Sequence, residues 1–279
     1  MLSVKKMKWR IINSGRCSPA ENMATDEAIM QGVIAQNSLP AIRFYDWDPP
    51  TVSCGFNQVV EKEVDLDLIN EQNLGFVRRP TGGRVVLHDH EVTYAVIAPI
   101  EERLAGNVTE SYAEISRALA RGLNILGVEV ELEKGMLSTS HQRQDANPCF
   151  ASSSRFELNF QRKKIVGSAQ VRREGVLLQH GSILLDNDQS KLSELLPGLD
   201  SEKKKKIADF LSRKTVAING ILKEPVSYDD AVLALTIGFE QIWETDQFEI
   251  CDDISSEEKD IVQKLINSKY LTEGWNKKK

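Results

Sequence analysis

The sequence predicts an α+β domain in which mixed sheets are flanked by helices and a helical appendage follows at the C-terminus. Strand-like alternation dominates the middle of the chain, while helical spacing dominates both ends. We find no internal repeat and no low-complexity linker. These observations predict a single domain over residues 1–279, with a mainly helical extension from about residue 190 onward.

The first half of the chain is predicted to alternate helices and strands. A helix is expected over residues 18–36, because Ser18 is a favourable N-cap, Pro19 suits the first helical position and Glu21 completes a capping box. Further elements are predicted as follows: strands at 41–47 and 51–58, a short acidic helix around 63–72, and a half-buried strand through Val92, Tyr94 and Val96.

The second half begins with a long helix over residues 109–127, for which Gly127 is the expected C-terminal cap. After it we predict a strand at 128–132, consecutive antiparallel strands at 154–160, 163–171 and 175–185, and serine-capped helices at 227–243 and 255–270. The basic run at 202–206 is interpreted as a solvated helix face, with binding of a partner as the alternative.

Composition excludes several classes of protein. A formal net charge of −6 over 279 residues argues against broad nucleic-acid binding. No apolar run reaches the roughly 20 residues of a membrane span, and the first ten residues have no apolar secretory core. The four cysteines lie far apart, which predicts reduced thiols in the cytoplasm and neither a disulfide framework nor a zinc site.

Two polar motifs are candidates for ligand binding. In "RRPTGGR" (78–84), two glycines permit close backbone approach to a ligand and two arginines attract an anion; a tight hairpin with solvated arginines is the alternative. In "LHDHE" (87–91), His88 and His90 are expected to share one face of a strand, with Asp89 on the other. Without further ligand spacing this pair predicts polar structure and no metal site.

Two further residues could carry covalent chemistry. Lys164 precedes the small residues Gly-Ser-Ala in "KKIVGSAQ" (163–170), although a strand lysine most often points to solvent. Cys149 lies in a polar loop and follows Pro148, which favours a reachable thiol over a buried, inert one.

Three segments together resemble a known family. "RRPTGGRVVLHD", "KKIVGSAQ" and "LLQHGSILLD", in this order and spacing, resemble the lipoate–protein ligases and octanoyltransferases, which share the biotin/lipoyl protein ligase fold. The resemblance extends from about Trp9 to the "GWN" near the C-terminus. Ligases of the family typically have a third glycine where this sequence has Arg84. The chain is more similar to the octanoyltransferases of the LipM type, in which the loop before the "SRFEL" strand supplies a nucleophilic cysteine.

The resemblance implies an activity and a set of site residues. Octanoyl would pass from octanoyl-acyl carrier protein to Cys149 as a thioester, and then to a lysine of a lipoyl domain, with the glycine cleavage H protein as the implied acceptor. Lys164 would stabilise the thiolate and the carbonyl oxygen. No cofactor and no metal are implied. The residues expected to bind substrate are Arg78, Arg79, Gly82, Gly83, His88, Gly167, Ser168 and His180.

Three other functions compete with this interpretation. An ATP-dependent lipoate–protein ligase is favoured by "RR-x-x-GG" and by a lysine that could contact a phosphate, but Cys149 and Arg84 argue against it. An octanoyl amidotransferase acting between lipoyl domains would also use a cysteine in this region. A non-catalytic acyl-binding relative would not need the pair Cys149 and Lys164.

Overall fold

The computed structural model describes residues 6–133, 157–186 and 188–278. In this part of the chain, one large sheet has the strand order β11-β1-β2-β6-β10-β9-β8-β7, and a small sheet has the order β4-β3-β5. The strands of the large sheet are β1 (Lys8–Cys17), β2 (Ala41–Trp47), β6 (Glu91–Pro99), β7 (Glu131–Glu133), β8 (Glu157–Phe160), β9 (Lys163–Arg173), β10 (Val176–Leu184) and β11 (Gln247–Cys251). Those of the small sheet are β3 (Thr51–Cys54), β4 (Gly75–Arg78) and β5 (Val86–His88).

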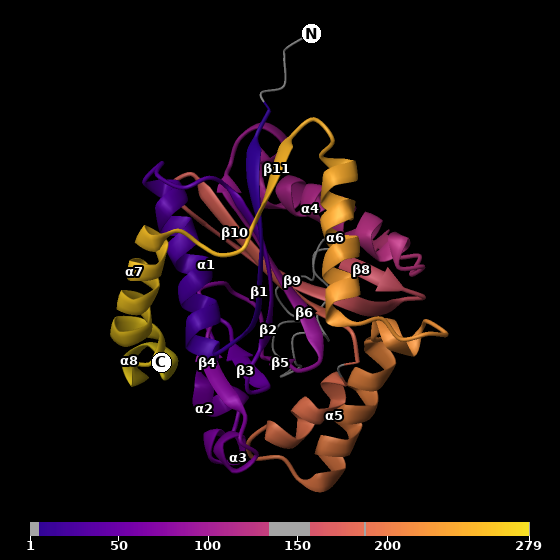
Figure 1. The fold of residues 1–279 in the computed structure, drawn as a ribbon. Coiled ribbons are helices and arrows are strands. Elements are labelled where there is room, and N and C mark those ends of the chain that lie inside the picture. Colours follow the sequence, from indigo (N-terminus) through magenta and orange to yellow (C-terminus); the bar gives the residue numbers. More distant parts are fainter. Residues whose placement is uncertain (1–5, 134–156, 187, 279) are drawn as a thin grey trace.

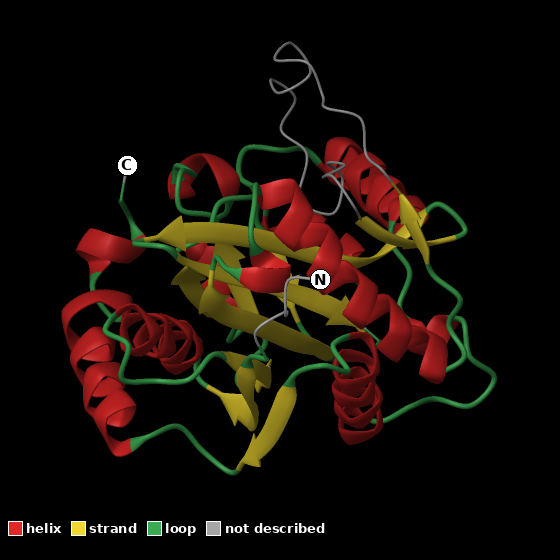
Figure 2. Ribbon diagram, turned by 90° about the horizontal axis from the view of Figure 1, so that it is seen from above, coloured by secondary structure: helices red, strands yellow, loops and turns green. Residues whose placement is uncertain are grey.

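Helices cover both faces of the large sheet (Figures 1 and 2). The α-helices are α1 (Pro19–Ile34), α2 (Val60–Glu63), α3 (Leu66–Glu71), α4 (Val108–Ile125), α5 (Ser201–Lys214), α6 (Tyr228–Ile242), α7 (Ser256–Leu265) and α8 (Glu273–Asn276). Short 3-10 helices are η1 (Glu102–Leu104), η4 (Gln189–Leu195) and η5 (Ile218–Gly220), and η6 (Ile266–Tyr270) is a π-helix. Helices α1 and α7 pack together on one face, and α4 and α6 pack together on the other. The α+β prediction, with mixed sheets flanked by helices, is confirmed.

The middle of the large sheet follows the sequence pattern closely. Strands β8, β9 and β10 are consecutive and antiparallel, as predicted. In β10, Gly181 lies between Tyr94 of β6 and Ser168 of β9, and its neighbour His180 faces the opposite side of the sheet. The register therefore determines which side chains of these strands share a face.

The predicted cap residues are in place, but the capping box predicted at Ser18 and Glu21 is present as one of its two hydrogen bonds. The Ser18 side chain accepts a hydrogen bond from the backbone N–H of Glu21 at the start of α1. Gly127 directly follows the C-cap of α4 with φ of +87°, a left-handed conformation that glycine adopts without strain. Helix α1 is buried on almost every side, and its buried residues include Asn22, Asp26 and Glu27.

The C-terminal extension is mainly helical, as expected, but it also contains a strand that the sequence did not indicate. Strand β11 pairs in parallel with β1 at the edge of the sheet, and Ile250 within it is 77% exposed. Helix α7 packs on α1, and α6 packs on α4. These contacts join the C-terminal extension to helices from the first half of the chain.

The expectation that His88 and His90 share one face of a strand is wrong. β5 ends at His88, and β6 begins at Glu91, so the two histidines do not share a strand. His90 has a φ of +44° and an exposed side chain, whereas His88 is buried. A turn at residues 89–90, through which the chain passes from β5 of the small sheet to β6 of the large one, replaces the continuous strand that the alternation had indicated.

Candidate active site

A cavity lies between the large sheet and the small one. Its volume is about 410 Å³ when the space at its open mouth is included. The lining residues are Met23, Tyr45, Trp47, Ser53, Arg79, Val86, His88, Thr93, Gly167, Ser168, Ala169, His180, Gly181 and Ser182. Five of the eight residues that the sequence indicated for substrate binding are therefore at one cavity: Arg79, His88, Gly167, Ser168 and His180.

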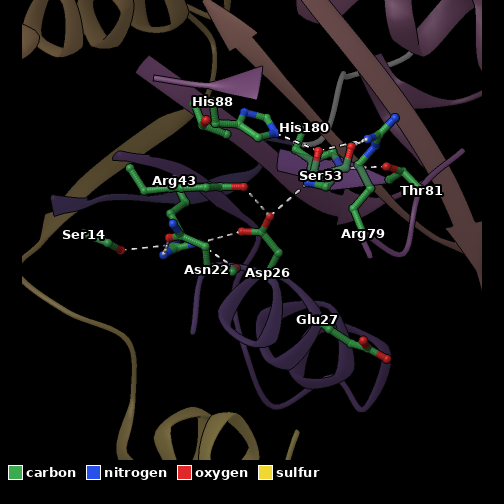
Figure 3. A network of polar contacts seen from close by, with 12 residues as sticks. Ser14, Asn22, Asp26, Glu27, Arg43, Ser53, Arg79, Thr81, His88 and His180 are labelled. Carbon is green, nitrogen blue, oxygen red and sulfur yellow. Dashed lines mark hydrogen bonds and ion pairs between the residues drawn. The ribbon is translucent and has the colours of Figure 1, made fainter. Parts of the chain in front are cut away.

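His180 is held between a carboxylate and a hydroxyl group (Figure 3). Its Nδ1 lies 3.1 Å from Oδ2 of Asp26, and its Nε2 lies 2.7 Å from Oγ1 of Thr81. Asp26 also accepts hydrogen bonds from Arg43 at 2.8 Å and from the hydroxyl of Tyr45 at 2.9 Å. The side chains of Asp26 and Arg43 are completely buried.

The charges in this network follow from burial and from the Arg43 partner. Burial lowers the pKa of His180 and outweighs the opposing effect of its hydrogen bond to Asp26. Burial alone would raise the pKa of Asp26, but His180 and Arg43 outweigh it, so the pKa of Asp26 is lowered. At neutral pH, Asp26 is a carboxylate that can only accept hydrogen bonds, and His180 is neutral with its proton on Nδ1. Nε2 of His180 then accepts a hydrogen bond from the Thr81 hydroxyl.

His88 has a similar arrangement on the opposite wall. Its Nε2 lies 2.7 Å from Oγ of Ser53, and its Nδ1 lies 2.8 Å from Oε1 of Glu91. Glu91 also accepts hydrogen bonds from Thr93 and Ser182. The indole of Trp47 stacks on the His88 ring with 4.3 Å between the centroids. These contacts hold the His88 ring in one orientation.

The two arginines of the "RRPTGGR" motif have different positions. Arg79 lines the cavity, and its guanidinium donates to the carbonyl and hydroxyl oxygens of Ser53 and to the carbonyls of Gly82 and Arg84. It therefore positions Ser53 and closes the glycine turn.

Arg78 does not line the cavity. Its side chain is fully buried, and its guanidinium donates to backbone carbonyls of Gly55, Phe56, Gln58, Trp275, Asn276 and Lys278. All three guanidinium nitrogens are used within the protein, so the geometry corrects the expectation of an anion site at Arg78. Its role is to attach the C-terminal segment to the small sheet.

Gly181 makes room for a hydrogen bond across the sheet. The hydroxyl of Tyr94 donates to Oγ of Ser168 at 2.7 Å, and Gly181 lies between these residues. A Cβ at Gly181 would lie 2.6 Å from Oγ of Ser168 and 2.8 Å from Cε1 of Tyr94. Only glycine fits here without displacing the site.

Gly82 and Gly83 line a second, more open hollow next to the first. Ser168 and Ala169 line both spaces. Gly83 has a φ of +96°, and its carbonyl oxygen lies only 2.1 Å from the position of a Cβ on Gly55, so the two turns approach each other closely. Gly82 and Gly83 thus line the second hollow, next to the first cavity, whereas His88 and His180 line the first cavity itself.

Lys164 is buried on β9, and the adjacent Lys163 is exposed. Lys164 pairs with Asn159 of β8 and forms a parallel bridge with Thr215, and its carbonyl accepts a hydrogen bond from Val216 N–H at 3.1 Å. It is not among the residues that line the first cavity. Cys149 lies outside the described residues.

The cysteines in the described part of the chain are poorly suited to act as nucleophiles. Burial raises the pKa of Cys54 to about 12, and burial also raises the pKa of Cys17 and of Cys251. Each is a free thiol in the structure. Because the thiolate is the reactive form, a raised pKa disfavours catalysis at all three positions.

Sequence reasoning missed Asp26, Arg43, Ser53, Thr81 and Glu91. One signal was available for Asp26, which is three residues after Met23 and four before Met30 and so lies on the apolar face of α1. An acid on such a face needs a buried partner. The other four are ordinary strand or turn residues in the sequence, and only the fold brings them together.

Among residues 6–133, 157–186 and 188–278, no group of three or more His, Cys, Asp or Glu residues is placed to hold a metal ion. Within the same residues, no helix combines the length and the apolar character that crossing a bilayer requires.

Comparison with known proteins identifies the family. Residues 18–240 match the family model described as the lipoyl protein ligase A/B catalytic domain. The chain belongs to the lipoyl protein ligase A/B catalytic domain family. Relatives named Octanoyltransferase LipM from Lysinibacillus sphaericus and Bacillus subtilis are 41% and 40% identical, over 97% and 99% of this chain and 99% and 100% of theirs.

Solved structures of the family are also similar to this chain. A bipartite lipoate protein ligase from Thermoplasma acidophilum, solved with its E2 lipoyl domain, has a TM-score of 0.79 at 26% identity, covering 97% of this chain and 96% of its own. A lipoate-protein ligase A bound with ATP has a TM-score of 0.78 at 25% identity, covering 97% of this chain and 99% of its own. The predicted lipoyl ligase fold is confirmed.

Proposed function

We infer that this chain is an octanoyltransferase of the LipM type, which transfers octanoyl from octanoyl-acyl carrier protein to a lysine of a lipoyl domain. The observation that carries this proposal is the identity of about 40%, over nearly the full length of both chains, to relatives named Octanoyltransferase LipM. We further propose the glycine cleavage H protein as the acceptor, and the cytoplasm as the compartment, since a thiol nucleophile needs reducing conditions.

The proposed reaction has two acyl transfers. The Cys149 thiolate attacks the octanoyl carbonyl carbon, the bond to the carrier sulfur breaks, and the carrier thiol leaves with a proton. The acceptor lysine amine then attacks the new thioester, an amide forms as the bond to the Cys149 sulfur breaks, the nitrogen releases one proton, and the Cys149 thiolate is regenerated. The donor is already activated as a thioester, so neither step needs ATP.

The cavity supports binding of an acyl chain. Met23, Trp47 and Val86 supply apolar wall, and the absence of side chains at Gly167 and Gly181 keeps the space open. Burying six methylenes at about 0.8 kcal/mol each would contribute on the order of 5 kcal/mol. His88 and His180, each held by two polar partners, provide polar groups along the same walls.

Intact mass spectrometry tests the proposal directly. Incubation with octanoyl-acyl carrier protein, without ATP, should add one octanoyl mass that hydroxylamine removes, and Cys149→Ala should abolish this adduct. Adduct formation at Cys17, Cys54 or Cys251 would contradict the assignment, and their raised pKa values argue against that outcome.

A lipoate–protein ligase remains the second candidate because of the likeness to a ligase structure with bound ATP. The contacts of Arg78 argue against the ligase, because its N–H donors are already bonded to backbone carbonyls and are not available for an adenylate phosphate. With free octanoate or lipoate, ATP and Mg²⁺, we expect the protein to leave a lipoyl domain unmodified. Efficient ATP-dependent modification would favour the ligase.

We propose Lys164 as the second catalytic residue. Lys164→Ala should lower the rate of single-turnover acylation by about 10²–10³, the usual effect of removing one donor to a developing oxyanion. Lys163→Ala is the matched control, because Lys163 is the exposed neighbour on the same strand. A small-molecule octanoyl thioester should serve as the donor, so that the assay is independent of carrier binding. Equal effects of the two substitutions would remove Lys164 from the mechanism.

A further inference from the structure

Helix α5 carries a cationic stripe that the catalytic site does not use. Lys203, Lys206, Phe210, Arg213 and Lys214 follow helical spacing along one side of the helix, and we call them the α5 stripe. Phe210 is half-buried within it, and the Lys214 ammonium lies 6.0 Å from its ring centroid. The stripe therefore combines exposed positive charge with one partly buried aromatic ring.

The charge of α5 contrasts with that of the chain. Residues 201–214 contain six Lys or Arg against two Asp or Glu, whereas the whole chain has a net charge of −6. The Lys203 and Lys206 side chains are 63% and 73% exposed. Their ion pairs with Asp200 at 3.2 Å and Glu202 at 2.7 Å are surface pairs, which contribute little and are easily exchanged for a partner's carboxylates.

The C-terminal end of α5 is next to the strand of the proposed catalytic lysine. Thr215, directly after Lys214, forms a parallel bridge with Lys164, and the N–H of Val216 donates to the Lys164 carbonyl. Helix α5 has 14 residues and so extends about 20 Å along its axis. Figure 1 shows α5 at the lower right, across the molecule from α7. The stripe thus begins at the strand of Lys164 and continues away from it.

We propose that the α5 stripe docks the protein that carries the octanoyl thioester, through an acidic face of that carrier. This inference rests on the proposed function. A carrier presents its thioester at the end of a long flexible arm, so its body can bind along a surface that extends a helix length from the reacting atoms. A lipoyl acceptor presents its amine on a single lysine side chain and must sit against the mouth of the site. Charge complementarity then increases the rate of carrier encounter.

Charge reversal on the stripe tests the proposal. Lys206→Glu/Arg213→Glu should lower kcat/KM for octanoyl-acyl carrier protein at least tenfold, the lower end of electrostatic steering effects. The same variant should transfer normally from octanoyl-N-acetylcysteamine, which has no carrier body. The control is Lys264→Glu/Lys277→Glu, which reverses two exposed charges on α7 and after α8 and should leave both donors unaffected.

Salt supplies a second measurement. Raising the ionic strength should lower kcat/KM for the carrier with the wild-type protein and should have much less effect on the stripe variant, because salt screens exposed charges. Equal losses with both donors would overturn the proposal, as would an undiminished kcat/KM for the carrier. A loss confined to kcat/KM for the lipoyl domain would show that the stripe binds the acceptor, and this result would also overturn the proposal.

Direct binding separates this inference from the proposed function. Fluorescence anisotropy with labelled holo-acyl carrier protein requires no turnover. If the wild-type protein transfers octanoyl from neither donor, the proposed function fails, and docking is then judged by anisotropy alone. Binding that the stripe reversal weakens tenfold or more supports the docking surface, and binding that is absent or insensitive to the reversal refutes it.

Discussion

The buried ion pair between Asp26 and Arg43 offers a sharp test of how the site is held together. Both side chains are fully buried, and the closest N–O distance is 2.8 Å. Asp26→Asn preserves volume but removes the negative charge and replaces one acceptor oxygen by an amide donor. Arg43 keeps its hydrogen bonds to Ser14 and Asn22, all of them to neutral groups.

The expected loss of stability is large. Breaking a buried ion pair by neutralising one partner costs about 3–5 kcal/mol, because the remaining charge is left without compensation. The neutral partners of Arg43 reduce this cost, while disturbed hydrogen bonds from Tyr45 or His180 add about 1 kcal/mol. We therefore expect Asp26→Asn to lower the free energy of unfolding by about 3–4 kcal/mol and Tm by roughly 10 °C.

The assay combines urea denaturation with octanoyl transfer at a temperature where every variant is folded. Glu258→Gln is the matched control, because Glu258 forms a buried pair with Arg10 through two hydrogen bonds of 2.7 Å, and neither residue lines the cavity. Both variants should lose stability. Only Asp26→Asn should also slow transfer, since Asp26 holds the proton of His180 on Nδ1 and fixes the ring at the cavity wall.

Two results would refute this reasoning. A loss of less than about 1 kcal/mol for Asp26→Asn would mean that the pair does not compensate a buried charge. An equal reduction of kcat/KM in Asp26→Asn and Glu258→Gln would mean that the network acts on stability alone and does not position His180.

The remaining predictions concern Gly181 and His180. Gly181→Ala places a Cβ 2.6 Å from Oγ of Ser168 and should destabilise the protein by about 1–3 kcal/mol and slow transfer. The control is Gly220→Ala, which should be nearly neutral because no atom lies within 4 Å of its Cβ position. Similar urea midpoints for the two variants would contradict the packing argument. The pKa of His180 is lowered from 6.5 by burial, so its contribution to stability is complete above pH 6.5 and is lost as pH falls below it. The urea midpoint of the wild-type protein should therefore fall between pH 7.5 and pH 5, and the midpoint of the His180→Asn variant should fall less steeply. A wild-type midpoint that rises on acidification would refute the predicted direction.

Much of the site was predictable because its chemistry lies in short, local motifs. His88, Gly167, Ser168 and His180 come from three separate segments, and all of them line one cavity. Strand alternation places Lys163 and Lys164 on opposite faces, and the structure shows that Lys164 is the buried one. These properties depend on residue type and on period, which the sequence contains directly.

Arg78 and Arg79 show where local information ends. As neighbours in the sequence they suggest one anion site, yet Arg79 positions Ser53 at the cavity while Arg78 binds the carbonyls of the C-terminal segment. Residue type determines that a guanidinium needs several acceptors, but which acceptors it meets depends on contacts about 200 residues away in the chain.

The sequence by itself determined the fold class, the helix caps, the antiparallel run of strands and the glycines that need open space, because each follows from local sterics and hydrophobic periodicity. Only the tertiary structure decided that Asp26 of α1 reaches His180 of β10, that β11 completes the sheet edge, and that the stripe on α5 begins beside Lys164. The physical reason is that a buried charge or an unpaired strand edge requires a partner, whereas the identity of that partner depends on how distant elements pack.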